Sequence, residues 1–244
     1  MHKDVPLEYA EEVEGWLSKK EGMLLYELAK ACKKGCIVEI GSWKGKSTIY
    51  IANGANQKVY AIDPHKGCDG EKFTGKDSYQ EFLDNISNFK LMDKVVPIVD
   101  YSINASKDFN NEVGFIFIDG SHDYRDVRED FEAWFEKVRE CGIIAMHDTV
   151  MKYGPRTIAN KYIYKSRHFK NTHLVGSITY ATKVMNNSFI DRLKNRFLLL
   201  KKTIKYMIKQ ITESENDYFW AFVSAITGLS MIFLLFLLIQ IVST

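Results

Sequence analysis

Residues 37–48 read Ile37-Val38-Glu39-Ile40-Gly41-Ser42-Trp43-Lys44-Gly45-Lys46-Ser47-Thr48. A short β-branched run leads here into two glycines, which let the backbone turn sharply and approach a ligand closely. This order is typical of a buried parallel strand that ends in a tight turn. The spacing is not that of a phosphate-binding loop, GxxxxGK[ST], because Gly41 and Gly45 enclose three residues instead of four. It also differs from the dinucleotide fingerprint GxGxxG, since Trp43 takes the place of the second glycine.

Further apolar runs of similar length follow along the chain. They are Val59–Ile62, Val95–Val99, Phe115–Ile118 and Ile143–Met146. Segments with helical spacing of apolar residues lie between them, at Tyr79–Ile86 and Val127–Val138. This alternation predicts an α/β domain over residues 1–184, with a Rossmann-like, doubly wound and mostly parallel sheet. Residues 177–184, SITYATKV, are expected to form a late strand at an antiparallel edge.

The composition is that of a folded chain with an unevenly charged tail. Of 244 residues, 46% are apolar and 26% charged, with only 15 Gly and 4 Pro, which excludes disordered and collagen-like chains. Residues 183–244 hold 8 Lys/Arg and 4 Asp/Glu, which leaves 25 and 27 for the rest. A body with a net charge of −2 is not a nucleic-acid-binding protein over most of its length. The cysteines at 32, 36, 68 and 141 lack zinc-site spacing, and we expect reduced core cysteines in a reducing compartment.

The tail has two segments that point to a membrane. Residues 219–242 contain no charged residue and are long enough to form a transmembrane helix, with Tyr218, Phe219 and Trp220 as its aromatic belt. Residues 189–211 have apolar residues on one helical face and basic residues elsewhere, which predicts an interfacial helix on anionic headgroups. The alternative is a helix packed on the domain with a solvated basic face.

The location of the body follows from the charges beside the span. Seven basic residues precede the span, namely Arg192, Lys194, Arg196, Lys201, Lys202, Lys205 and Lys209. By the positive-inside rule we expect a single-pass protein with a C-terminal anchor and a cytoplasmic catalytic domain. The N-terminus has no apolar run of the kind found in a cleaved signal peptide.

Polar residues at the strand ends are the candidate site, because ligands of such sheets bind at the carboxyl ends of the strands. Glu39, Gly41 and Gly45 close the first strand, and Asp63 closes the second, at a spacing that suits an acidic group on a ribose. Together they favour a pocket for a nucleoside cofactor, although the loop has no feature that would bind a pyrophosphate.

A second group follows the later strands. Asp119 and His122 follow one strand, and His147 and Asp148 follow the next. Two carboxylates and two imidazoles above neighbouring strands are suited to acid–base catalysis or to a divalent metal.

The body resembles the class I methyltransferases that use S-adenosylmethionine, especially the branch with cephalosporin-hydroxylase-like and macrocin-O-methyltransferase-like proteins. The resemblance runs over roughly residues 15–150. It is carried by EGMLLYELA, VEIGSWKGKST, VYAIDP, FIFIDGSHDYRDVREDFEAW and CGIIAMHDT, in this order.

The resemblance implies roles for individual residues. Glu39, Gly41, Ser42 and Gly45 would line the methionine portion of the cofactor. Asp63 would hold the ribose, and Asp100, Tyr101 and Ser102 would lie by the adenine. Asp119 and Asp148 match positions that bind a divalent ion, Mg²⁺ or Ca²⁺, in metal-using relatives. Thr149 departs from this pattern, because an Asn ligand is usual at its position.

The predicted function is that of a membrane-anchored S-adenosylmethionine-dependent methyltransferase. Its acceptor is expected to be a hydroxyl of a small molecule, a sugar or a lipid-linked molecule. His122 is the expected base, with Asp119, or a metal that it and Asp148 hold, orienting the hydroxyl. The alternative is a non-catalytic, membrane-anchored module that binds the cofactor.

Overall fold

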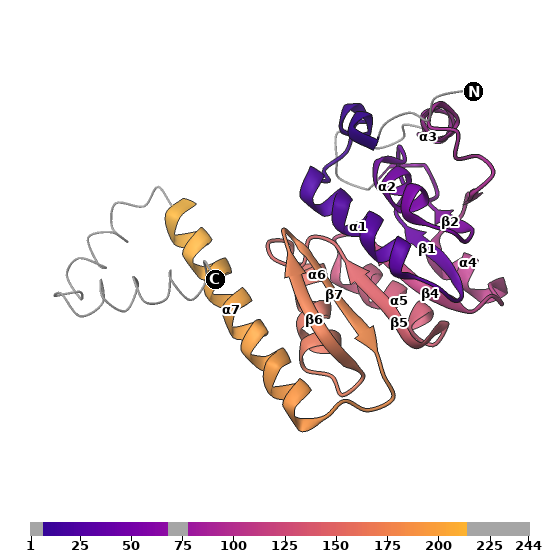
Figure 1. Cartoon of the computed structure of the whole chain (residues 1–244). Coiled ribbons are helices and arrows are strands. Elements are labelled where there is room, and N and C mark those ends of the chain that lie inside the picture. The colour runs from indigo at the N-terminus through magenta and orange to yellow at the C-terminus, as the bar shows by residue number, and fades with distance from the viewer. Residues whose placement is uncertain (1–6, 68–77, 214–244) are drawn as a thin grey trace.

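A computed structural model of the chain describes residues 7–67 and 78–213 (Figure 1). The N-terminal elements in chain order are η1 (Leu7–Glu12), α1 (Lys19–Ala31), β1 (Cys36–Ile40), α2 (Lys46–Gly54), β2 (Val59–Ile62), α3 (Tyr79–Asn88), β3 (Val95–Ile98) and α4 (Ser102–Asp108). The C-terminal elements are β4 (Val113–Ile118), α5 (Tyr124–Phe135), β5 (Val138–Met146), α6 (Tyr153–Ile158), η2 (Ala159–Tyr164), β6 (Phe169–Val175), β7 (Ile178–Lys183) and α7 (Phe189–Glu213).

One sheet of seven strands forms the centre, in the order β3-β2-β1-β4-β5-β7-β6. β1 to β5 run parallel, with Ile40 beside Ile62 of β2 and Ile118 of β4. β7 runs antiparallel to both β5 and β6. The predicted Rossmann-like, mostly parallel sheet is therefore confirmed, and so is the late antiparallel strand.

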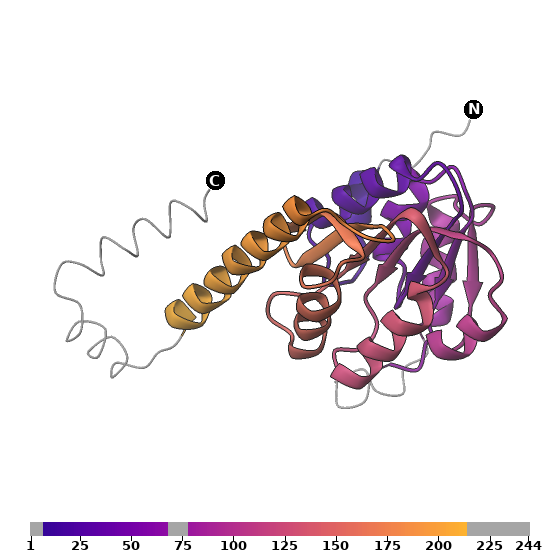
Figure 2. The same cartoon turned by 90° about the horizontal axis from the view of Figure 1, so that it is seen from below.

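Alternate residues of the strands supply two cores, one on each face of the sheet. Ile37, Phe115 and Phe117 point to the face that is covered by α1, α2 and α3. Val38 and Ile116 point to the other face, where α4, α5, α6 and η2 pack. Figure 2 shows these helices on both sides of the sheet. The two-sided burial explains why the central strands are continuous apolar runs.

The sequence-based boundaries differ from the structure in three places. The predicted helix Val127–Val138 ends earlier, because α5 stops at Phe135 and Val138 begins β5. β6 was not predicted. Its sequence FKNTHLV mixes exposed polar residues with buried Phe169 and Thr172, as an edge strand does. The expectation of core cysteines is wrong for Cys141, which is exposed, although Cys32 is buried.

α7 follows the sheet and packs against β6 and η2 at the outer edge of the molecule (Figures 1 and 2). Its bounds, Phe189–Glu213, contain the predicted helix 189–211. Among residues 7–67 and 78–213, no helix combines the length and apolarity needed to cross a bilayer. The predicted span 219–242 lies outside these described residues.

Candidate active site

The carboxyl ends of β1, β4 and β5 meet at one edge of the sheet. The backbone N–H of Asp119 donates to Ile40 O at 2.8 Å, and that of His147 donates to Ile118 O at 3.0 Å. In strand order β1 stands between β2 and β4, where the connections change direction. A crevice at this place is where open α/β sheets bind their ligands. The fold thus gathers the predicted residues of both groups at one edge.

The turn after β1 lies directly against the end of β4. Gly41 has a φ of 85°, and a Cβ at this position would be 2.1 Å from the carbonyl oxygen of Asp119. A side chain cannot fit there, which explains the glycine. Gly45, with a φ of 87°, is the N-cap residue of α2. The predicted sharp turn is therefore confirmed, and the backbone that it approaches closely is that of Asp119.

Glu39 and Ser42 bring polar atoms into this turn that have no partner among the described residues. Glu39 is fully buried, and its Oε2 accepts a hydrogen bond of 2.5 Å from the Thr48 hydroxyl. Burial raises the pKa of Glu39 to about 7, although hydrogen bonds from Ser47 and Thr48 act in the opposite direction. Glu39 Oε1 and Ser42 Oγ are buried without a hydrogen-bond partner in the described part of the chain. Such atoms are rare in folded proteins, so they are candidates to contact a bound ligand.

Asp63 lies beside this turn at the end of β2. Its Oδ2 accepts a hydrogen bond from the backbone N–H of Trp43 at 2.8 Å, and its Oδ1 accepts one from that of His65 at 2.6 Å. The carboxylate therefore holds the glycine turn in place. Each oxygen retains a further lone pair that can accept a hydroxyl of a ligand.

The side chains of the residues that follow β3 make hydrogen bonds within the protein. Asp100 Oδ1 accepts hydrogen bonds from Tyr101 N–H at 2.7 Å and from Asn104 Nδ2 at 3.1 Å, so Asp100 holds the first turn of α4. The Ser102 hydroxyl donates to Asp130 and accepts from Trp134 Nε1 at 3.3 Å. This hydroxyl joins α4 to α5 and does not point to a ligand. Only the backbone of Ser102 can serve the predicted adenine site.

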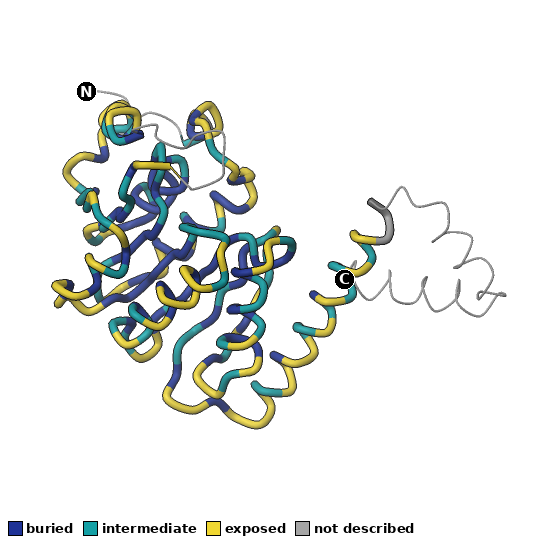
Figure 3. The backbone as a smooth tube through the Cα atoms, turned by 180° about the vertical axis from the view of Figure 1, so that it is seen from behind, coloured by how far each residue is buried: buried dark blue, intermediate teal, exposed yellow. Residues whose placement is uncertain are grey.

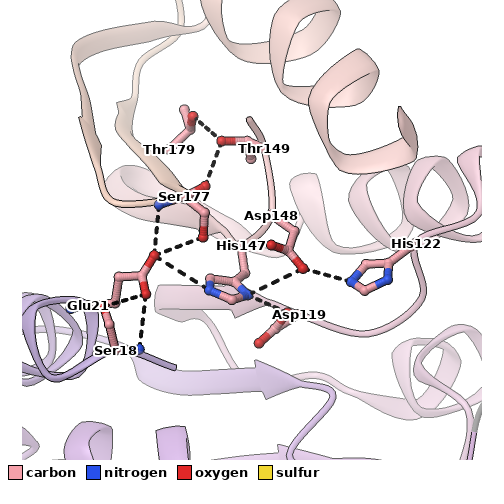
Figure 4. Close-up of polar contacts among 9 residues, drawn as sticks. All are labelled: Ser18, Glu21, Asp119, His122, His147, Asp148, Thr149, Ser177 and Thr179. Atoms are coloured by element: carbon pink, nitrogen blue, oxygen red, sulfur yellow. Dashed lines mark hydrogen bonds and ion pairs between the residues drawn. The ribbon is translucent and has the colours of Figure 1, made fainter. Parts of the chain in front are cut away.

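The acid–base group is one connected cluster at the ends of β4 and β5 (Figure 4). His122 Nε2 lies 2.9 Å from Asp148 Oδ2, and both side chains are partly exposed. His147 is buried, with Nδ1 3.0 Å from Asp119 Oδ1 and 3.8 Å from Asp148 Oδ2. The predicted convergence of the two carboxylates and two imidazoles is thus present.

The two histidines of the cluster differ in their surroundings. Burial acts to lower the pKa of His147, but the carboxylates of Asp119, Glu21 and Asp148 raise it to about 10. Burial raises the pKa of Asp119, although His147 acts against this rise. For Asp148, burial is outweighed by the hydrogen bond from His122 and the charge of His147, so its pKa is lowered. His147 is therefore a charged, buried partner of carboxylates, whereas His122 is open to an incoming molecule.

Glu21 of α1 is part of this cluster and was not predicted from the sequence. Its Oε1 lies 3.6 Å from His147 Nε2, which is an ion-pair distance and too long for a hydrogen bond. The same oxygen accepts hydrogen bonds from Ser177 N–H at 2.7 Å and from the Ser177 hydroxyl at 2.8 Å. Oε2 accepts from the Ser18 hydroxyl at 2.6 Å, in a capping box at the start of α1. The spacing of Ser18 and Glu21 could have indicated the cap, but nothing near them in sequence indicates the contact with His147.

Thr149 does not replace the Asn ligand of metal-using relatives. Its hydroxyl donates to Ser177 O at 2.8 Å and lies 2.7 Å from that of Thr179, away from the two aspartates (Figure 4). His122 instead supplies a third group. Asp119, His122 and Asp148 each offer one ligand atom, and these atoms lie within 4.8 Å of one another. Two carboxylates and one imidazole are a donor set that can hold a divalent cation.

Comparison with known proteins gives a match over the strands that build this site. Residues 38–149 match a protein family described as a methyltransferase domain. The match begins in β1 and ends at Thr149, directly after His147 and Asp148. It includes the glycine turn and Asp119. Residues 38–149 are therefore identified as a methyltransferase domain.

Solved structures of methyltransferases share its fold. An O-methyltransferase from Bacillus cereus in complex with S-adenosylhomocysteine is 18% identical, with a TM-score of 0.56 over 72% of this chain and 90% of that one. The O-methyltransferase TomG from Streptomyces achromogenes in complex with S-adenosylmethionine is 15% identical, with a TM-score of 0.55 over 69% and 82%.

A curated relative matches about half of the chain. The uncharacterized protein y4gI of Sinorhizobium fredii is 24% identical over 131 residues. The match covers 51% of this chain but only 14% of y4gI.

Proposed function

We propose that the methyltransferase transfers the methyl group of S-adenosylmethionine to a hydroxyl oxygen of a small-molecule, sugar or lipid-linked acceptor. The observation that carries this proposal is the pair of His122 and Asp148, 2.9 Å apart and partly exposed beside the glycine turn. A carboxylate that binds one imidazole nitrogen leaves the other nitrogen as a proton acceptor. The O-methyltransferases with the same fold agree with an oxygen acceptor.

The cofactor would occupy the crevice between the glycine turn and Asp63. Glu39 Oε1 and Ser42 Oγ, which lack partners within the described residues, would contact the methionine portion beside Gly41 and Gly45. Asp63 would accept the ribose hydroxyls through the lone pairs that Trp43 and His65 leave free. Asp100 and the backbone of Ser102 would lie by the adenine.

The reaction needs positioning and removal of one proton. The acceptor oxygen attacks the methyl carbon in line with the sulfonium, the carbon–sulfur bond breaks, and the sulfur leaves as a neutral thioether. His122 takes the hydroxyl proton and becomes an imidazolium beside the ionised Asp148. Asp119, held by His147 at 3.0 Å, orients the hydroxyl.

A divalent cation would be held by Asp119 and Asp148. Bound there, it would supply a Lewis acid that makes the acceptor hydroxyl more acidic. His122 lies close enough to be a third ligand, in which case it would not act as the base. The imidazolium of His147 already offsets the charge of Asp119, so the cluster is also suited to work without a metal.

We also propose that the methyltransferase is anchored in a membrane, with its catalytic domain in the cytoplasm. Residues 219–242 would be the anchor, and the basic α7 before it would contact anionic headgroups. The seven basic residues upstream of the anchor support this orientation. Protease accessibility in sealed inverted vesicles would test it. We expect the body to be digested, and protection would contradict the orientation.

The activity is tested by incubating the full chain and membrane extract with S-adenosylmethionine that carries a labelled methyl group. We expect label in an extractable product whose methyl resists the mild base that cleaves esters, as an ether does. Parallel reactions with EDTA, and with EDTA followed by Mg²⁺, test the metal. If the chain binds the cofactor tightly but labels no acceptor, it is the non-catalytic binding module, and the proposed function is wrong.

A further inference from the structure

α7 has six large apolar residues on the side that faces away from the protein. Phe189, Ile190, Leu193, Phe197, Leu200 and Met207 are all exposed. From Leu193 they recur at steps of four, three and seven, and Phe189 and Ile190 lie one turn before Leu193, so the six form one apolar stripe along the helix, which we call the α7 stripe. Leu193, Phe197 and Leu200 each have more than half of their surface exposed, at 54%, 53% and 55%. Figure 3 shows exposed positions along the whole of the described helix.

The opposite side of α7 attaches it to the body through polar residues. Asn195 Nδ2 donates to Phe169 O of β6 at 3.0 Å, and Asn195 is buried. Lys202 is also buried, and its Nζ donates to Asn160 Oδ1 of η2 at 2.9 Å. At about 100° per residue, Asn195 and Lys202 lie on the far side of the helix from the stripe.

A further contact holds the C-terminal half of α7 against the body. The guanidinium of Arg156 in α6 lies 4.0 Å from the ring centre of Tyr206. α7 is therefore packed on the domain, as one prediction for this segment stated, but with the buried polar residues Asn195 and Lys202 towards the body and the α7 stripe outward. A helix that merely covered the domain would place its apolar residues the other way round.

The charged residues of α7 indicate what kind of partner covers the α7 stripe. Basic residues flank it along the helix, at Lys194, Arg196, Lys201 and Lys205. Asp191 is the one acidic residue before Glu213, and its carboxylate accepts hydrogen bonds from Ser188 at the helix start. Two copies that paired stripe to stripe would bring these like charges together, which is unfavourable. An anionic bilayer satisfies both the apolar stripe and its basic flanks.

The sequence after α7 also supports a bilayer as the partner of the α7 stripe. The uncharged segment 219–242 begins six positions after Glu213, so anything that places that segment in a bilayer also brings α7 to its surface.

We propose that the α7 stripe is a membrane-docking surface that is fixed to the catalytic domain and inserts into the headgroup region of an anionic bilayer. The proposal rests on the proposed membrane anchor for its setting and adds a second, separate contact. Because Asn195, Lys202 and Tyr206 fix the helix to the body, docking would also set the orientation of the active site relative to the bilayer.

The test separates the stripe from the anchor by ending the chain at Asp217. This shorter chain retains every residue of the two described cores and all of α7. Flotation is measured with phosphatidylcholine vesicles and with vesicles that also contain phosphatidylglycerol, at low and high salt. We expect binding to the anionic vesicles that weakens at high salt.

Paired substitutions identify the surface. Leu193→Ser with Leu200→Ser should weaken binding to the anionic vesicles by about tenfold or more, because the apolar contact is lost. Met23→Ser with Met92→Ser, which changes exposed apolar residues elsewhere on the body, should leave binding unchanged. All four positions are exposed, so thermal unfolding should be similar in both variants. Lys194→Gln with Lys201→Gln should reduce the difference between the two vesicle types.

Three outcomes would overturn the proposal. The shorter chain could bind neither kind of vesicle at low salt, or the stripe variant could float as well as the unaltered chain. Sedimentation could instead show a dimer that the stripe substitutions dissociate, without vesicle binding. The full chain with the stripe substitutions serves as the check on the anchor: if residues 219–242 span the membrane, it stays membrane-bound, whatever happens to the stripe.

Discussion

Glu21 Oε1 lies 3.6 Å from His147 Nε2, so a carboxylate from the first long helix faces an imidazole from the end of the fifth strand. His147 in turn contacts Asp119 through Nδ1 at 3.0 Å. Both outer groups are carboxylates, and the imidazole between them is buried. The matched methyltransferase domain, residues 38–149, contains His147 and Asp119 but not Glu21. This chain therefore completes the cluster around His147 with a residue from outside that domain.

The first prediction concerns Glu21→Gln. The amide oxygen can still accept hydrogen bonds from Ser177, but the negative charge beside His147 is lost. We expect turnover to fall by about tenfold, which corresponds to about 1.4 kcal/mol, while cofactor affinity measured by calorimetry stays within about twofold. Ser177→Ala is the matched control, because the Ser177 N–H still donates to Glu21. Equal losses in both variants would mean that Glu21 only holds the turn between β6 and β7.

A second prediction concerns His122→Ala. Loss of a general base typically lowers turnover by about 100-fold or more, and cofactor affinity should barely change because His122 lies outside the glycine turn. The measurement is steady-state transfer of labelled methyl groups. Full activity in this variant would assign the base role to another residue.

Asp148→Ala distinguishes a metal from a simple acid–base pair. The substitution removes the partner of His122 and one of the two proposed metal ligands. We expect turnover to fall as far as in His122→Ala. With a bound cation, EDTA should abolish activity in the unaltered enzyme and Mg²⁺ should restore it. Turnover that resists the chelator would exclude the metal from the reaction.

Asp63 provides a test of the cofactor site. Asp63→Ala should weaken S-adenosylmethionine binding by about 1.5–3 kcal/mol, as expected for charged hydrogen bonds. The variant also loses the bonds from Trp43 and His65, so Asp63→Asn, which keeps one carbonyl acceptor, should lose less. Calorimetric binding that is unchanged in both variants would contradict the assignment.

Lys202 gives a prediction for stability against pH. Burial, and to a smaller extent the charge of Arg156, lowers the pKa of Lys202 from 10.5 to about 7 in the folded protein. Between these values the unfolded chain binds more protons, so the free energy of unfolding should rise as the pH rises from about 7 towards 10. Lys202→Met should remove this rise and stabilise the protein below pH 7. Lys201→Met at the half-exposed neighbouring position is the control, and denaturant unfolding at several pH values is the measurement.

The sequence predicted most strands because β1 to β5 are short apolar runs between polar turns, a pattern that burial on both faces imposes. β6 escaped prediction, since Lys170, Asn171 and His173 interrupt its apolar residues at the sheet edge. Parallel strands end at a common edge, and so Asp119 and Asp148 could be placed together from their positions alone.

Other parts of the site could not be predicted, because they depend on contacts between distant segments. The hydroxyl of Ser102 is directed by Asp130 and Trp134 of α5. The contact of Glu21 with His147 depends on how α1 packs beside the turn between β6 and β7. Likewise, the pattern of residues 189–211 showed an amphipathic helix but not which of its faces meets the body.

The bond between Glu21 and Ser177 also sets an order of events during synthesis. The two residues are 156 positions apart, and at about 5–20 residues per second the ribosome needs roughly ten seconds or more between them. Throughout that time a nascent chain that already holds the whole matched domain still lacks the hairpin that fixes the carboxylate of Glu21. The cluster around His147 can therefore be completed only after the hairpin of β6 and β7 has been synthesised.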